Sequence, residues 1–267
     1  MQVVILCGGK GTRIRDVTED IPKPMIPVGG RPILWHIMKG YARHGFKQFI
    51  LCLGYKSWII KQFFLDYGRM FSDISLDLHA PESLTVHNAS VEDWHVTLAE
   101  TGLDAMTGAR VKRIEKYVQG SHFLLTYGDG LADLDIGGLV DSHLRHGKLG
   151  TVTAVQPPGR FGEIEFQGHR VVEFSEKPLL SRGRISAGYF VFHRRFFDRL
   201  DDRDDLVLER EPLQQLARDG QLGAYLHDGF WHCMDNSRDY QYLNQLWDSG
   251  EAPWDSGPAD PALRAAA

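Results

Sequence analysis

Apolar runs that suit β-strands alternate along this chain with segments in which apolar residues recur at helical spacing. In the first quarter, strands are predicted over residues 3–7 and 46–55, and helices over 32–45 and 57–68. In the first of these helices one face collects Ile33, Leu34, Ile37, Met38 and Tyr41, and Pro32 suits the first turn. This alternation predicts βαβ units on a mainly parallel sheet, and therefore an α/β fold with a Rossmann-like sheet flanked by helices.

The later segments continue the alternation but include two irregular parts. Further strands are predicted over 123–130, 151–157 and 187–193, and helices over 108–119 and 136–147. Residues 73–100 alternate apolar and polar positions between turn formers, which predicts short antiparallel strands in an inserted β arm, a candidate subunit contact. Residues 161–174 predict a hairpin with Gly168 in its turn. We expect one domain over 1–254 and a flexible tail over 255–267.

Composition narrows the class of protein. A chain of 267 residues, 43% of them hydrophobic, can bury a sizeable core, which excludes a disordered or fibrous protein. No apolar run approaches the roughly 20 residues that span a bilayer, and the glycines arrive too early for a secretory signal, so a cytoplasmic protein without membrane contact is predicted. The net charge of −5 gives no footprint for nucleic acid, and an anionic ligand must be held by a few placed cations.

The first strand ends in glycines followed by two cations. Gly8, Gly9 and Gly11 would leave backbone N–H groups open to a phosphate at the carboxyl edge of the sheet. Arg13 follows, and Lys23 stands between two prolines that restrict its backbone. The glycine spacing matches neither the dinucleotide motif nor the P-loop, and a proline-rich surface turn is the alternative. Glycines and cations together favour an anion site.

Two further motifs place charged residues at strand ends. Asp129 ends the strand in LLTYGDG (124–130), where a carboxylate beside phosphates suits Mg²⁺, and Asp235 is the candidate second ligand. Either acid alone is more often a turn or cap residue, and Asp235 would also suit the cap of the helix that follows it. In FSEKP (174–178), Lys177 suggests a second phosphate-bearing ligand, against the alternative of an exposed pair with Glu176.

These motifs resemble a known family. GGKGTR (8–13) and PKPM (22–25) match the signature of the sugar-1-phosphate nucleotidylyltransferases. Longer stretches, among them LGYKSWIIKQFF (53–64), TYGDGLADLDI (126–136) and HDGFWHCMD (227–235), resemble a subgroup within it that joins CTP to glucose 1-phosphate. The resemblance covers nearly the whole chain up to Trp254.

The resemblance implies a reaction and the residues for it. CTP and a sugar 1-phosphate, expected to be α-D-glucose 1-phosphate, would give CDP-glucose and pyrophosphate with Mg²⁺, by in-line attack without a covalent enzyme intermediate. The product is a nucleotide sugar, and the enzyme would be a homo-oligomer. The implied nucleotide-binding residues are Leu6, Gly8, Gly9, Gly11, Thr12, Arg13, Lys23, Thr107, Arg110 and Gly128. The implied sugar phosphate-binding residues are Tyr127, Gly162, Glu176, Lys177, Ser186 and Gly188. Asp129 and Asp235 would hold the metal, and Arg13, Lys23, Asp129 and Lys177 would be catalytic.

Departures from the family pattern keep alternatives open. Ser186 and Ala187 replace the first two residues of an Asn-Gly-Gly run, and LVLEREPL (206–213) lacks a tryptophan that the family carries before EPL. Such changes near sugar hydroxyls bear on substrate choice. The alternatives are the same chemistry with another sugar phosphate or with UTP or dTTP, and a catalytically silent, nucleotide-binding regulatory protein. The absence of GxGxxG disfavours a dinucleotide-dependent oxidoreductase.

Overall fold

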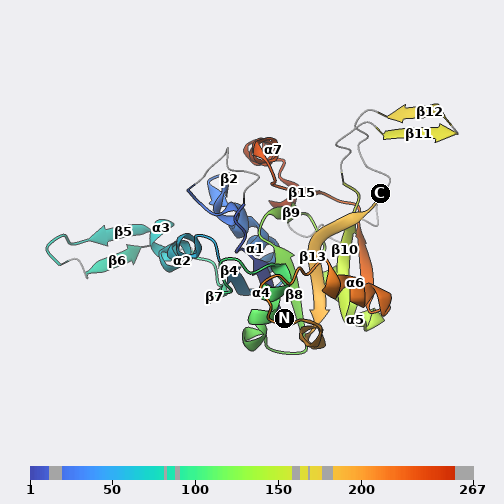
Figure 1. Ribbon diagram of the computed structural model, residues 1–267. Coiled ribbons are helices and arrows are strands. Elements are labelled where there is room, and N and C mark those ends of the chain that lie inside the picture. The colour runs from blue at the N-terminus through green and yellow to red at the C-terminus, as the bar shows by residue number, and fades with distance from the viewer. Residues whose placement is uncertain are drawn as a thin grey trace.

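A seven-stranded sheet forms the centre of the molecule, in the strand order β14-β10-β13-β8-β1-β4-β7 (Figure 1). This computed structural model describes residues 1–11, 20–80, 83–87, 91–157, 163–167, 169–175 and 183–255. The strands are β1 (Gln2–Leu6), β4 (Gln48–Leu53), β7 (His95–Glu100), β8 (His122–Tyr127), β10 (Gly150–Val155), β13 (Ile185–His193) and β14 (Leu222–His227). Only β13 runs antiparallel to its neighbours, β8 and β10. The predicted α/β fold on a mixed, mainly parallel sheet is confirmed.

Both faces of this sheet are buried under helices. Val3 and Ile5 of β1 join one core cluster, with apolar residues of α1 (Ile33–Arg43), α2 (Ser57–Leu65), α5 (Ile136–His146) and α7 (Ser237–Asp248). Val4 and Leu6 join the other, with residues of α4 (Thr107–Arg113), α6 (Glu211–Arg218) and the 3-10 helix Arg194–Arg199. Successive side chains of a strand point to opposite faces, so the uninterrupted apolar run of β1 fits a strand covered on both sides.

The predicted antiparallel insertion is a hairpin of β5 (Asp73–Leu76) and β6 (Leu84–His87), which projects from the body beside α2 and α3 (Tyr67–Met70) (Figure 1). The expectation that all of residues 73–100 belong to this arm is wrong for residues 95–100. These form β7, which pairs in parallel with β4 at the edge of the main sheet. Their alternating pattern comes from an edge strand that is only partly covered, with Ala99 buried and His95 and Glu100 exposed, and such a pattern does not reveal the partner strand.

The remaining elements are short. Three small antiparallel sheets of two strands each are also present. They pair β2 (Pro27–Val28) with β3 (Arg31–Pro32), β9 (Gly130–Ala132) with β15 (Trp231–Cys233), and β11 (Glu163–Gln167) with β12 (Arg170–Ser175). The last pair agrees with the predicted hairpin; Gly168 lies outside the described residues. The helix expected over 108–119 is shorter: α4 ends at Arg113, and a 3-10 turn follows at Glu115–Tyr117. Two further 3-10 turns span Lys23–Met25 and Pro253–Asp255. Among the helices that the structure describes, none has the length and apolar character to cross a bilayer.

The strand order brings the ends of three parallel strands together at one edge of the sheet. From β1 the chain leads to β4 on one side, and β8 flanks β1 on the other, with Leu6 in register with both Cys52 and Tyr127. The carboxyl ends of all three strands therefore meet at one edge. The loop after β1 and the turn after β8 open toward the same crevice, which is where open α/β sheets place their ligands.

Candidate active site

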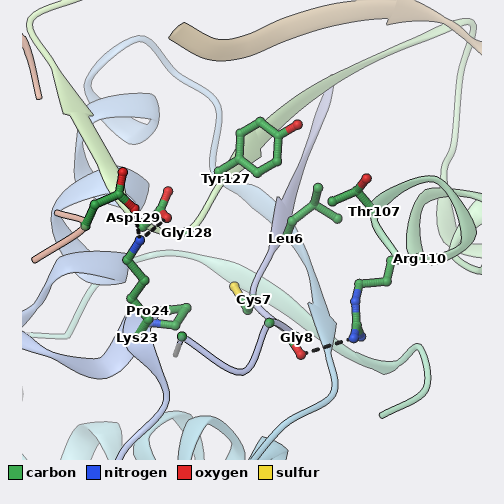
Figure 2. A pocket seen from close by; sticks show the side chains of 13 residues that line it. Leu6, Cys7, Gly8, Lys23, Pro24, Thr107, Arg110, Tyr127, Gly128 and Asp129 are labelled. Carbon is green, nitrogen blue, oxygen red and sulfur yellow. Dashed lines mark hydrogen bonds and ion pairs between the residues drawn. The ribbon is translucent and has the colours of Figure 1, made fainter. Parts of the chain in front are cut away.

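A pocket of about 400 Å³ lies at this edge of the sheet. The loop after β1, the turn after β8, the first turn of α4 and the segment after β15 all contribute to it. Figure 2 shows Lys23 and Asp129 at one end and Thr107 and Arg110 at the other, with Leu6 between them. The pocket is lined by Leu6, Cys7, Gly8, Gly9, Gly11, Lys23, Pro24, Thr107, Arg110, Tyr127, Gly128, Asp129 and Asp235.

Two carboxylates converge on one ammonium at the first end. Lys23 Nζ donates to Asp129 Oδ2 at 2.6 Å and to Asp235 Oδ1 at 2.7 Å. The side chain of Lys23 is 13% exposed, and those of Asp129 and Asp235 are 25% and 26% exposed. Burial alone would lower the pKa of Lys23, but attraction and hydrogen bonds to the two carboxylates outweigh it and raise the pKa above the ordinary value. Lys23 is therefore a permanent cation here.

Strand pairing brings Asp235 to Asp129. Cys233 of β15 lies opposite Gly130 of β9, and the Met234 amide donates to the Asp129 carbonyl at 2.9 Å. Residues that flank this pair on the two strands are thus neighbours in space, although far apart in sequence.

The alternative that Asp235 caps α7 is wrong. The cap is Asn236, whose side chain accepts from the amides of Arg238 and Asp239, and the Asp239 carboxylate accepts from the Asn236 amide to complete a capping box. Asp235 precedes the cap, and one oxygen of its carboxylate accepts from Lys23 instead.

Arg110 holds the glycine loop (residues 8–11) through a hydrogen bond to Gly8 O. This side chain is 4% exposed. Its Nη1 donates to Leu53 O, Thr101 Oγ1 and Gly102 O, and its Nη2 donates to Gly8 O and Leu103 O. A Cβ at Gly8 would lie 2.1 Å from Arg110 Nη1, so the close approach requires glycine there. Arg110 ties the loop after β1 to the ends of β4 and β7; its role as a direct nucleotide ligand stays a prediction.

Tyr127 connects the pocket with the next strand. Gly188 of β13 has a φ of +79°, and a Cβ there would lie 2.4 Å from Tyr127 Cδ2, so the ring packs on bare backbone. The Tyr127 hydroxyl donates to Glu209 Oε1. Burial, followed by the Glu209 carboxylate, raises the pKa of Tyr127, which keeps the phenol protonated.

The structure brings together every described residue assigned to nucleotide and metal: Leu6, Gly8, Gly9, Gly11, Lys23, Thr107, Arg110, Gly128, Asp129 and Asp235 all line one pocket. Among the sugar phosphate residues, Tyr127 lines it too. Gly188 packs against the ring of Tyr127 and so lies next to the pocket. Ser186 Oγ accepts a hydrogen bond from the Gly188 amide at 3.3 Å. Thr12, Arg13, Gly162, Glu176 and Lys177 lie outside the described residues.

Comparisons with known proteins decide the family. A family model described as nucleotidyl transferase matches residues 2–240. The chain is 49% identical over 255 residues to the glucose-1-phosphate cytidylyltransferase of Salmonella typhi, covering 95% of this chain and 98% of that protein. This chain belongs to the nucleotidyl transferase family.

Other nucleotidyl transferase relatives agree. The probable glucose-1-phosphate cytidylyltransferase of Bacillus subtilis is 42% identical over 254 residues, covering 95% of this chain and 99% of that protein. Among solved structures, HddC from Yersinia pseudotuberculosis matches with a TM-score of 0.66 at 24% identity, over 92% of this chain and 99% of that one. That likeness concerns the fold alone.

Three residues of this nucleotidyl transferase site were missed by sequence reasoning. Cys7 and Pro24 line the pocket because they adjoin the glycine loop and Lys23. Glu209 accepts from Tyr127 and from Thr107 Oγ1, the latter at 2.8 Å. Cys7 and Pro24 stand inside recognised motifs, so proximity in sequence was an available signal. Glu209 lies in LVLEREPL (206–213), a stretch expected near the sugar, but no local pattern indicates its contacts with Thr107 and Tyr127, which are 102 and 82 residues away.

Proposed function

We propose that this nucleotidyl transferase joins CTP to α-D-glucose 1-phosphate and releases CDP-glucose and pyrophosphate. The observation that carries this proposal is the identity of 49% over 95% of the chain to a glucose-1-phosphate cytidylyltransferase. The pocket supports it, because glycine-loop backbone, a braced lysine and two carboxylates meet at one end and Leu6 and Thr107 stand toward the other (Figure 2).

The arrangement supports one orientation of a bound nucleotide. The triphosphate would lie along Gly8–Gly11, where backbone N–H groups and Lys23 attract anions. The base would then extend toward Leu6, whose side chain offers an apolar contact, and toward Thr107, which offers a hydroxyl. Arg13 and Lys177, carried over from the family motifs, would add cations for the triphosphate and the sugar 1-phosphate respectively.

Asp129 and Asp235 fit a magnesium site. Their carboxylate oxygens contact the same Lys23 ammonium, so they lie close enough to share a small cation. Mg²⁺ prefers one or two carboxylates, with phosphate oxygens and water completing its octahedron, rather than an all-protein cage. When bound, Mg²⁺ would neutralise charge that develops on the phosphates. Lys23 would then be released from the carboxylates toward the triphosphate.

The chain's own contribution is positioning and charge. The sugar phosphate oxygen attacks the α-phosphorus of CTP while pyrophosphate leaves on the opposite side, and no covalent enzyme intermediate forms. Gly8, Gly9 and Gly11 hold the phosphates in line, Lys23 stabilises the growing negative charge, and Arg110 keeps the loop in place. Effective positioning of this kind supplies several kcal/mol of the barrier reduction.

The test is pyrophosphate release by the purified protein with Mg²⁺, CTP and α-glucose 1-phosphate, with UTP, dTTP, ATP and GTP run in parallel. We expect robust release with CTP. Release with CTP but only from another sugar phosphate would transfer the proposal to that sugar, and Ser186 with Ala187 would be the first place to look. Nucleotide binding without turnover of any sugar phosphate would favour the silent regulatory protein.

The carboxylate pair has its own test. Asp235→Asn keeps the shape but removes the charge, so we expect turnover to fall at least about a hundredfold and Mn²⁺ binding, followed by electron paramagnetic resonance, to weaken. Asp141→Asn, on the exposed face of α5, is the matched control and should leave both unchanged. Normal turnover in the Asp235 variant would remove that residue from the metal site.

Oligomerisation and cellular location complete the proposal. The β5–β6 hairpin exposes Ile74, Leu76 and Val86, and an apolar arm of this kind supports a homo-oligomer with the arm as contact. Light scattering on the purified chain tests this. We also expect the enzyme to be cytoplasmic, where its nucleotide substrate is found.

A further inference from the structure

An exposed carboxylate beside the pocket accepts hydrogen bonds from two hydroxyls that line it. Glu209 accepts from Thr107 Oγ1 at 2.8 Å through Oε2 and from the Tyr127 hydroxyl through Oε1. Both donors line the pocket, whereas Glu209 does not. An ionised carboxylate only accepts hydrogen bonds, and each hydroxyl has a single proton to give. Thr107 and Tyr127 therefore present lone pairs, not protons, to a ligand.

The segment that carries Glu209 is fixed to the first turn of α4. The amides of Met106 and Gly108 donate to Asp204 O and Leu206 O, at 2.7 and 2.9 Å. In return, the Leu208 amide donates to Thr107 Oγ1 at 2.9 Å, which leaves that oxygen one lone pair. Glu209 follows directly on the chain, so its carboxylate is held beside both hydroxyls.

Several donors near these two hydroxyls already have acceptors inside the fold. The Nη protons of Arg110 have five acceptors inside the fold. The amides of Ala109 and Gly128 donate to the carbonyls of Leu206 and Leu6. Among the described side chains at the Thr107 end of the pocket, the hydroxyl oxygens of Thr107 and Tyr127 are therefore the groups that can accept a hydrogen bond from a ligand. Figure 2 shows the Tyr127 hydroxyl directed toward the Thr107 side of the pocket.

We infer that Glu209 is a positioning residue for base selection, which makes the Thr107–Tyr127 wall an acceptor that recognises the amino group of cytosine. The inference rests on the proposed function, because it places the base at this end. Cytosine offers an N–H₂ donor where uracil and thymine carry a carbonyl oxygen. The carbonyl oxygen of uracil or thymine would face the lone pairs of Thr107 and Tyr127, so it would lose its hydrogen bond to water and gain no donor in exchange. This unpaired group makes binding of UTP or dTTP less favourable than binding of CTP.

Glu209→Gln is the deciding variant. The amide keeps the size of the side chain but has one acceptor and one donor group, so one of the two hydroxyls must turn its proton toward the pocket. We expect the ratio of kcat/KM for CTP to that for UTP to fall about tenfold, as UTP improves and CTP worsens. Asp205→Asn is the matched control: it lies on the same segment, is 87% exposed and pairs with Arg203. It should keep the wild-type ratio.

The outcomes separate the possibilities. A Glu209→Gln ratio within about twofold of wild type, in a protein with an unchanged melting temperature, overturns the inference. A raised KM for glucose 1-phosphate with an unchanged nucleotide ratio also overturns it, since the wall would then serve the sugar. If the wild-type protein turns over neither nucleotide with glucose 1-phosphate, the proposed function fails by itself. Calorimetric titration of Mg²⁺-CTP and Mg²⁺-UTP into wild type and Glu209→Gln then measures base selection without turnover.

Discussion

Replacing Arg110 by Met tests whether this buried guanidinium acts as a structural tie. Met fills a similar apolar volume but donates no hydrogen bond. The change removes five hydrogen bonds that join the loop after β1 to the end of β4 and to residues 101–103.

The size of the stability loss depends on which of the five acceptors still receive a hydrogen bond from another donor in the Arg110→Met variant. Leu53 O still accepts from the Thr101 amide and hydroxyl, and Gly8 O still accepts from the Tyr55 amide. Gly102 O and Leu103 O lose the donor that Arg110 gave them, and because both residues are exposed, water replaces part of each bond at a net cost of about 0.5–1.5 kcal/mol. Burial lowers the pKa of Arg110, so removing its charge recovers part of that loss. We expect a net decrease of about 1–3 kcal/mol in the free energy of unfolding.

Urea denaturation measures this loss, and calorimetric titration with Mg²⁺-CTP measures affinity in parallel. Arg110→Lys, which keeps the charge but reaches fewer acceptors, should lose about half as much stability. Arg199→Met is the control, because Arg199 is 41% exposed and its side chain pairs with Asp219, and it should cost less than about 1 kcal/mol. If Arg110→Met is as stable as Arg199→Met yet binds no nucleotide, Arg110 is a ligand residue and the structural reasoning is wrong.

Three further predictions concern stability and packing. Asn236→Ala should destabilise the protein by about 1 kcal/mol in urea titrations through the lost α7 cap, and a null effect would contradict the capping box. Burial and the neighbouring rings of His122, His146 and His193 lower the pKa of His143 from 6.5 to about 4; the unfolded chain therefore takes up the proton first, and stability should fall by up to about 3 kcal/mol from pH 6.5 to 4. The same titration on His143→Gln should show a shallower fall. Gly188→Ala should cost more than about 2 kcal/mol and reduce turnover, since its φ of +79° and its contact with Tyr127 both exclude a Cβ; a stable, active variant would refute this.

The sequence by itself determined the local structure and the chemistry of the loops. Apolar runs and helical spacing placed β1, α1, β4 and α2 correctly, because local periodicity reports which face of an element is buried. The rule that parallel strands end together placed the glycine loop and Asp129 at one sheet edge.

Tertiary structure alone decided which distant residues meet. Pairing of β9 with β15 brought Asp235 to Asp129, a pair that the family resemblance named but that no local pattern explains, and left the capping of α7 to Asn236. Residues 95–100 became an edge strand of the main sheet because a parallel partner, β4, was available. Glu209 joined the site through two hydrogen bonds that span 102 and 82 residues. Such contacts arise from the packing of whole elements, and no local pattern of side chains encodes them.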